Sequence, residues 1–203
     1  DLAGGNLLLT LFFTMITSLL LGMGAPTTAN YVITSTVAAP ALIKLGVPLV
    51  AAHMFVFYFG IVADITPPVA LAAMAGAAIA KSNPWWTGVN ASKIAIAAFI
   101  VPYVFVFSPA LVLVDASIAL VVQMVITSVI GMIGVGAAVE GWYWTHMAWW
   151  ERIGALAAGL MLIDPTTLTD AIGITLMVVI TALQYRKARQ ARAVTGDPVA
   201  AAN

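Results

Sequence analysis

The chain has 203 residues, of which 63% are hydrophobic and 8% are charged, and its formal net charge is zero. Soluble domains carry about a quarter charged residues, so the composition indicates an integral membrane protein that is almost wholly embedded in lipid. The neutral charge gives no sign of a nucleic-acid partner, and the lack of cysteine excludes disulfides and thiolate metal sites. Because Asp1 leads directly into an apolar segment, we expect the chain to be the C-terminal piece of a longer polypeptide.

The first two apolar helices are predicted over residues 5–22 and 29–45, and the sequence GMGAPTTANY (residues 22–31) separates them. Two glycines and a proline interrupt the helix there, and the threonines and Asn30 bring hydroxyl and amide groups to the break. An interrupted helix survives in lipid only where protein or a water-filled cavity surrounds it. The residues alone leave two interpretations open: an ordinary spanning pair, or a re-entrant hairpin whose uncharged tip ends near mid-membrane.

A third apolar stretch, residues 49–80, is too long for one span. As a single helix it would measure about 48 Å, whereas the hydrocarbon core is about 30 Å thick. Pro67 and Pro68 divide it and remove two N–H donors, so nearby carbonyls are freed to bind a ligand. The alternative is a simple proline kink. Asp64, just before the break, is a functional candidate as an intramembrane carboxylate, or else a cap of the second half-helix.

The remaining chain alternates between apolar segments and interfacial turns. An interfacial turn with a tryptophan anchor and a short surface helix are expected before the next span. The glycines of the following span, Gly131, Gly134 and Gly136, suit close helix approach. The expected elements are the turn at residues 81–86, the surface helix at 87–93, spans at 94–107, 117–139, 147–163 and 169–185, and an aromatic interfacial patch at 140–152.

Half of the basic residues follow the last span: Arg186, Lys187, Arg189 and Arg192. Lys and Arg are retained on the cytoplasmic side of membranes, so the C-terminus is predicted to be cytoplasmic. Counting spans backwards places the turn at residues 108–115 outside.

Two motifs taken together, GMGAPTTANY at residues 22–31 and ADITPPVALA at residues 63–72, resemble one family. They are similar to the large permease subunit of tripartite ATP-independent periplasmic (TRAP) transporters, in the TAXI subgroup. The likeness covers roughly residues 5–114. The three spans after residue 117 match, by their layout, the C-terminal extension common in fused TAXI permeases.

The resemblance implies an all-α polytopic membrane protein, the second inverted repeat of an elevator-type transporter. The implied segments are a re-entrant helical hairpin (1–46), a broken helix of the transport domain (47–83), an interfacial arm and scaffold helix (84–115), a C-terminal three-helix extension (116–187) and a disordered cytoplasmic tail (188–203).

The resemblance also implies a sodium site between the hairpin tip and the break. Unwound carbonyls suit a hard cation such as Na⁺, and half-helix N-termini suit an anionic substrate. The implied sodium-binding positions are Gly22, Gly24, Ala63, Thr66 and Val69, and the implied substrate-site positions are Pro26, Thr27, Thr28, Asn30 and Asp64. No cofactor and no other metal is expected beyond Na⁺ as the coupling ion.

The expected function is import of a small organic anion, a carboxylate, by a sodium-coupled permease subunit in the inner membrane of a bacterium or archaeon. Its expected partners are a periplasmic TAXI-type solute-binding protein, the first inverted repeat and a small membrane subunit, fused or separate. The alternative is a structural or assembly subunit without its own transport site. An enzyme is not expected, because the sequence has no cysteine, no His pair at metal-ligand spacing and no Glu beside a His.

Overall fold

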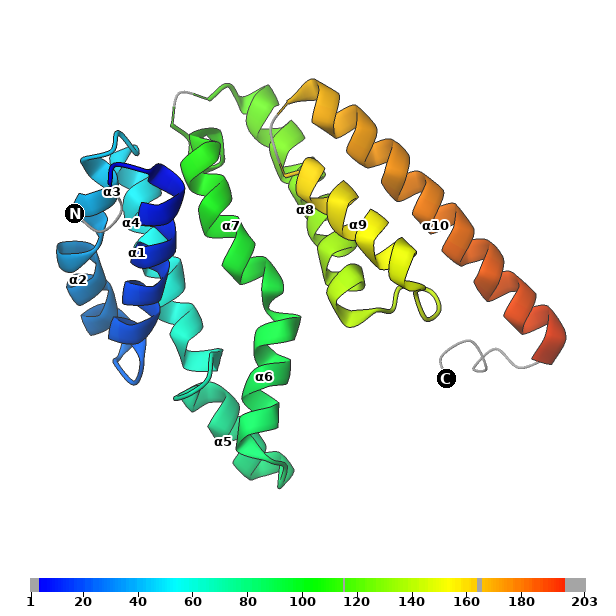
Figure 1. The fold of residues 1–203 in the computed structure, drawn as a ribbon, viewed down its shortest axis with the longest axis horizontal. Helices are drawn as coiled ribbons and strands as arrows, with labels where there is room; N and C mark the ends of the chain where they lie inside the picture. Colours follow the sequence, from blue (N-terminus) through cyan, green and yellow to red (C-terminus); the bar gives the residue numbers. More distant parts are fainter. Residues whose placement is uncertain (1–3, 115, 164–165, 196–203) are drawn as a thin grey trace. The chain divides into compact units, whose positions relative to one another are not determined.

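The computed structural model describes residues 4–114, 116–163 and 166–195, which form ten α-helices and two 3-10 helices. The predicted all-α class is therefore confirmed for these residues (Figure 1). The chain divides into two compact units, Asp1–Ser117 and Ile118–Asn203, which are described separately.

The first unit begins with a helical hairpin made of α1 (Leu7–Gly22), α2 (Thr27–Val37) and the short α3 (Ala39–Ile43). α1 starts at Asn6, whose side-chain oxygen accepts the N–H of Leu9 at 3.2 Å, as an N-cap does. The sequence predicted one helix over residues 29–45, but the structure divides it at Ala38. Pro40 explains the division, since it has no N–H to continue the helical hydrogen bonds.

The broken helix follows as α4 (Leu49–Val62), the 3-10 turn η1 (Ala63–Ile65) and α5 (Leu71–Ala80). α4 is the centre of the unit and packs against α1, α2 and α7. Phe55 and Phe59 on α4 are fully buried, and both rings meet Tyr103 of α7 edge-on, at centroid distances of 5.3 and 5.9 Å. This aromatic core fixes α4, and with it the start of the break, against α7.

The last helices of the first unit are α6 (Pro84–Ile94), α7 (Ile96–Phe107) and the 3-10 turn η2 (Pro109–Val112). Asn83 caps α6 by accepting the N–H of Trp86 at 3.2 Å. α6 and α7 meet at a bend of 43° and are together long and apolar enough to count as one bent span.

The second unit contains α8 (Ile118–Glu140), α9 (Trp149–Met161) and α10 (Thr167–Thr195). α9 packs against both neighbours, whereas α8 and α10 contact each other much less. A Cβ on Gly131 would lie 2.7 Å from the carbonyl oxygen of Gly159, and one on Gly159 would lie 2.5 Å from that of Gly131. Backbone therefore packs on backbone there, and Gly134 likewise faces Met177 closely, whereas Gly136 has no neighbour within 4 Å.

The second unit differs from the sequence prediction in two places. α9 has 13 residues, about 20 Å, which is short of a membrane span; it begins and ends two residues inside the predicted span of 147–163. Residues 141–148, which lie in the predicted interfacial patch, form a loop with a β-bridge between Trp142 and His146. The C-terminal extension thus has two helices of spanning length, Ile118–Glu140 and Leu168–Gln190, rather than three. α10 also runs to Thr195, beyond the predicted start of the tail at residue 188, because its Ala, Arg and Gln residues favour helix. Residues 196–203 lie outside the described residues.

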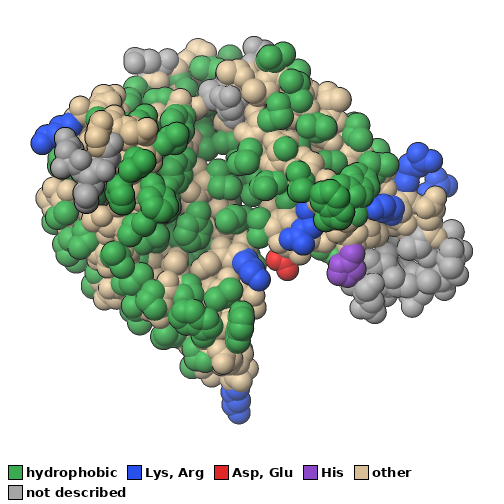
Figure 2. Space-filling model, viewed as in Figure 1, with side chains coloured by type: hydrophobic (Ala, Val, Ile, Leu, Met, Phe, Trp, Pro, Cys, Tyr) green, Lys and Arg blue, Asp and Glu red, His purple; other side chains and the backbone are tan. Residues whose placement is uncertain are grey.

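Both units expose so many apolar side chains that we expect lipid or another protein to cover their surface. Figure 2 shows hydrophobic side chains over most of the visible face, with few charged groups. Ile79 is 87% exposed and Ile118 is 84% exposed. Soluble monomers rarely expose continuous apolar surface on this scale, so the fold supports the membrane assignment made from composition.

The glycine contacts of the second unit predict unequal effects of two alanine substitutions on the same helix. Gly131→Ala should lower the melting temperature of the detergent-solubilised protein by several degrees, because overpacking costs about 1–3 kcal/mol. Gly136→Ala should leave it unchanged or slightly higher, since alanine is favoured over glycine inside a helix. Equal shifts for both variants would contradict the backbone contact between α8 and α9.

Candidate functional site

The turn between α1 and α2 lies against the end of α4, four residues before Asp64. A Cβ on Gly22 would overlap the carbonyl oxygen of Gly60 and would lie 2.9 Å from the amide nitrogen of Asn30. A Cβ on Gly60 would in turn lie 2.5 Å from the amide oxygen of Asn30. The Asn30 side chain is therefore held between two glycine backbones from different helices.

Asn30 is the most unusual polar group in this unit. It is only 1% exposed, and neither its amide oxygen nor its amide nitrogen has a hydrogen-bond partner among the described residues. A buried polar group without a partner costs about 1–3 kcal/mol. A buried group of this kind is explained by local strain, by a functional role, or by a water molecule or ion that binds there.

Further polar side chains line the inside of the hairpin next to Asn30. Ser18 lies one turn before Gly22 on α1; it is fully buried, and its hydroxyl also lacks a described partner. Thr34 lies one turn after Asn30 on α2, and its hydroxyl donates to the Asn30 carbonyl at 2.8 Å. Thr14, one further turn back on α1, lines a cleft of about 800 Å³ between the two arms of the hairpin, which Lys44 also lines. The interior of the hairpin is thus polar, whereas its outer face carries exposed apolar side chains.

The break itself rearranges the hydrogen bonds of the helix end. In a continuous helix, residues 67 and 68 would donate to the carbonyls of residues 63 and 64, but prolines have no N–H to give. The N–H of Thr66 instead reaches the Ala63 carbonyl at 3.2 Å, and the Thr66 hydroxyl donates to the Val62 carbonyl at 2.7 Å. The oxygens of Ala63 and Thr66 each keep lone pairs, so both remain able to coordinate a cation.

The middle and C-terminal part of α6 contact the break on another side. The Ser92 hydroxyl donates to the carbonyl of Ile65 at 3.1 Å. A Cβ on Gly88 would lie 3.1 Å from the ring of Pro67, so α6 contacts the break closely there. The break is therefore contacted by α6 and also by α1 of the hairpin.

Asp64 does not cap the second half-helix. The N-cap position of α5 is Ala70, and no side chain caps that helix. Asp64 is half-buried within η1, and its carboxyl group has no hydrogen-bond or ion-pair partner in the described part of the chain. The capping alternative is thus wrong, and the carboxylate remains free to act on a ligand.

The tip of the hairpin is exposed. Pro26, Thr27 and Thr28 are accessible at the start of α2, and no side chain caps this helix either. Gly24, with φ of +75°, lies in the turn, and a Cβ on it would reach the Leu71 side chain of α5 at 4.0 Å. The uncapped N-termini of α2 and α5 therefore belong to the same region of the unit.

A separate apolar groove of about 560 Å³ lies between α2 and α4. Tyr31 and His53 line it, and the Tyr31 hydroxyl lies 2.9 Å from Nδ1 of His53. The imidazole is thus hydrogen-bonded to a neighbouring side chain, which agrees with a packing role.

The structure brings the predicted positions together in two groups. Gly22 and Asn30 meet at the end of α4, while Ala63, Thr66 and Val69 lie in and beside η1, which α1 also contacts. Sequence reasoning missed Gly60 and Ser18. Ser18 could have been found by spacing, because it precedes Gly22 by one helical turn. No local signal identifies Gly60 as the partner of Gly22.

Comparison with known proteins identifies the family to which the chain belongs. The sequence model described as "Tripartite ATP-independent periplasmic transporter, DctM component" matches residues 1–120. The chain belongs to the DctM family. No curated protein and no solved structure matches it.

As a DctM component, the chain is part of a TRAP transporter and is a permease rather than an enzyme. TRAP systems lie in the inner membrane and are tripartite, with a periplasmic binding protein and a small membrane subunit besides the DctM component. The match covers the whole of the first unit, so the hairpin and the broken helix both lie inside it.

The contact between Gly60 and Asn30 predicts that Gly60→Ala will impair the DctM permease. The added methyl group would displace the Asn30 amide, whose position is fixed from the other side by Gly22. Uptake by proteoliposomes containing the transporter should fall at least tenfold. Gly76→Ala on α5 is the matched control, because nothing lies within 4 Å of that position; an equal loss in both variants would show that the contact is unimportant.

Proposed function

We propose that this DctM permease is a sodium-coupled importer of a small organic anion, and that the Asn30 amide forms part of its sodium site. The supporting observation is the fully buried Asn30 side chain, which lies between Gly22 and Gly60 with both polar atoms unpartnered. A cation bound to the amide oxygen would supply the missing interaction.

The chemistry of the surrounding oxygens favours Na⁺. Hard cations prefer oxygen ligands, and neutral carbonyl and hydroxyl oxygens at unwound helices coordinate Na⁺ in other secondary transporters. The amide of Asn30 supplies such a ligand beside Gly60 at the end of α4, and the oxygens of Ala63, Thr66 and Val69 supply others in and just after η1, which follows α4 and is contacted by α1. Asp64 adds one negative charge in η1 without occupying a hydrogen bond, which balances a monovalent cation. Gly22, which faces Gly60, and Gly24, which faces the Leu71 side chain, are the hairpin backbone positions proposed to complete the site.

The substrate is proposed to be a carboxylate bound beside this site. The N-termini of α2 and α5 lack side-chain caps, so their first N–H groups and the positive ends of their dipoles are available to an anion. Pro26, Thr27 and Thr28 are exposed at the α2 end. A TAXI-type solute-binding protein would deliver the anion, and a first inverted repeat would supply the rest of the site.

Alternating access is proposed to follow the elevator mechanism. The hairpin and α4 share the core around Phe55 and Phe59, so the two halves of the site are suited to moving as one body.

The competing function is a structural or assembly subunit without a transport site. The buried, unpartnered amide argues against it, because a purely structural contact would be more stable with an apolar residue there.

Asn30→Leu separates the two functions by a thermal-shift measurement. The unmodified transporter should melt about 5–10 °C higher in saturating sodium than in potassium, since ligand at 100 times its Kd adds about 2.7 kcal/mol. The variant should lose this sodium shift. In potassium it should melt no lower than the unmodified protein, because the two unpartnered polar atoms are gone.

Asn90→Leu is the control for this experiment, since Asn90 is an exposed asparagine on α6. It should keep the full sodium shift. Asn30→Asp gives a second variant: its buried carboxylate needs the cation more strongly, so its sodium shift should exceed that of the unmodified protein. A full sodium shift in Asn30→Leu would rule out the amide as a ligand.

The proposed orientation places the C-terminal end of α10 in the cytoplasm, because Arg186, Lys187 and Arg189 cluster there. The chain has no cysteine, so single cysteines can be introduced at positions 110 and 189. A membrane-impermeant thiol reagent added outside the cell should label position 110 and leave position 189 unmodified. The opposite labelling pattern would reverse the topology.

A further inference from the structure

An apolar groove of about 590 Å³ lies between α8 and α10 in the second unit. Ile133 forms one rim and is 50% exposed; Val178 forms the other and is 61% exposed. Met177 of α10 also lines the groove, and its sulfur lies near Gly134 of α8, where a Cβ would come within 2.8 Å of it. The groove is therefore closed on the side of the helix contact and open on the other.

The polarity of the groove changes along its length. Ile130, Ile133 and Ile174 line one end, whereas Tyr143, Thr181 and Tyr185 line the other. The hydroxyls of Tyr143 and Thr181 lie 3.5 Å apart. The apolar end is followed by hydroxyl groups in the direction of the C-terminus of α10.

The stripe of α10 that lines the groove continues into basic residues. Arg186 and Arg189 follow Ala182 and Tyr185 by four residues each, so they extend the same face of the helix. Both side chains are exposed, and in the part of the chain that the structure describes neither has a hydrogen bond or an ion pair.

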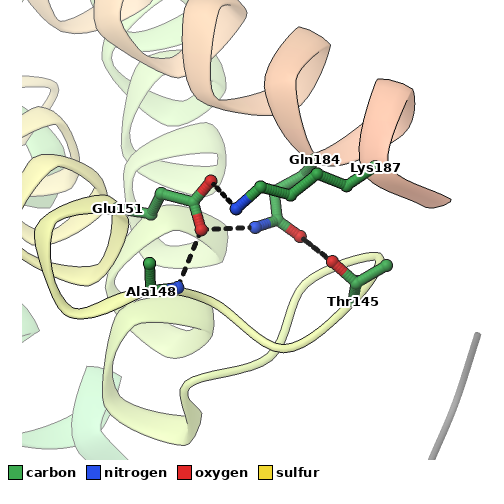
Figure 3. A network of polar contacts seen from close by, with 5 residues as sticks. All are labelled: Thr145, Ala148, Glu151, Gln184 and Lys187. Carbon is green, nitrogen blue, oxygen red and sulfur yellow. Dashed lines mark hydrogen bonds and ion pairs between the residues drawn. The ribbon is translucent and has the colours of Figure 1, made fainter. Parts of the chain in front are cut away.

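The neighbouring basic residues are already engaged elsewhere. Lys187 points away to α9, where its ammonium pairs with the fully buried Glu151 at 2.6 Å (Figure 3). Glu151 also accepts from Gln184 at 2.9 Å and from the N–H of Ala148 at 2.8 Å. The Arg152 guanidinium donates to the last carbonyls of α8, those of Ala138 and Val139. The acidic Glu140 is exposed at the end of α8, yet it forms no ion pair with either free arginine. Among the basic side chains that the structure describes in the second unit, those left for a ligand are thus Arg186 and Arg189.

We propose that this groove binds one anionic phospholipid, with an acyl chain between α8 and α10 and its phosphate at Arg186 and Arg189. The order of apolar side chains, hydroxyls and cations matches the order of chain, glycerol-ester region and phosphate in such a lipid. A transmembrane helix is the other occupant considered. With side chains it is about 10 Å across, so the groove would hold only about five of its residues, whereas an acyl chain follows a narrow groove along its length.

The inference does not depend on the sodium or substrate proposal and is tested by lipid binding alone. The transporter is purified in detergent and exchanged into nanodiscs made from phosphatidylcholine with increasing phosphatidylglycerol, and bound lipid is counted by native mass spectrometry. Each basic residue near an anionic lipid strengthens binding about fivefold, so Arg186→Gln with Arg189→Gln should weaken phosphatidylglycerol binding about 25-fold. Phosphatidylcholine binding should not change.

Lys81→Gln with Lys93→Gln is the matched control, because both lysines are exposed basic residues outside the second unit. This double variant should leave the amount of bound phosphatidylglycerol unchanged. An equal loss in the two double variants would mean only a general attraction to an anionic membrane, and the proposal of a site would be wrong.

A second pair of variants tests the groove itself. Val178→Trp fills the groove and should expel the lipid whatever its headgroup, whereas Val179→Trp, also on an exposed face of α10 but outside the groove, should not. Should Val178→Trp fail to insert, the arginine variants still decide the question. The proposal is overturned if the unmodified transporter retains no phosphatidylglycerol, as a groove filled by a protein helix would cause.

Discussion

The hairpin and the broken helix can meet at their ends only because Gly22 and Gly60 carry no side chains. The Asn30 amide occupies the space between these two backbones and is sealed from solvent by them. Every other feature of the proposed site depends on this contact: it brings α1 against η1, it places the exposed tip beside the start of α5, and it leaves a polar group where only a polar ligand would satisfy it. Phe59, the residue before Gly60, packs against Tyr103 of α7 and so fixes this end of α4 from the other side.

The helical content and the two breaks were predictable from the sequence, because glycine and proline interrupt apolar segments by a local mechanism that needs no tertiary information. The partner of Gly22 was not, since Gly60 lies 38 positions away in sequence (60 − 22) and nothing local distinguishes it from a helix-packing glycine. Asn30 was recognised as a site residue, but its burial follows from the packing of α2 on α4. α9 is two residues shorter than the predicted span at each end, and its start is held by the network around Glu151, whose ion pair with Lys187 joins residues 36 apart and could not be read from the local sequence.

The two units differ in where their polar side chains are buried. In the first unit the polar groups Ser18, Asn30 and Thr34 are inside, and the outside is apolar. In the second unit the interior contact of α8 with α9 is made by glycine backbone, and buried polar groups lie in two places: Glu151 and Gln184 near the start of α9, and Asp170 in the first turn of α10. One Asp170 carboxylate oxygen accepts from Gln123, and the other has no partner among the described residues. At Asn30 both polar atoms lack such a partner and lie between two glycine backbones, which is why the transport proposal rests on the first unit.

The hydrogen bond from Ser92 to Ile65 joins two elements with different neighbours. Ile65 ends η1, whereas Ser92 lies on α6, which the 43° bend separates from α7. A change in the break on ion binding would therefore be transmitted through this bond to the hinge at Ala95. Trp85 and Trp86 lie in the first turn of the same short helix and are half exposed. A rearrangement of the break would thus change the surroundings of these two indole rings, and fluorescence could follow it in a variant whose four tryptophans of the second unit are replaced by phenylalanine.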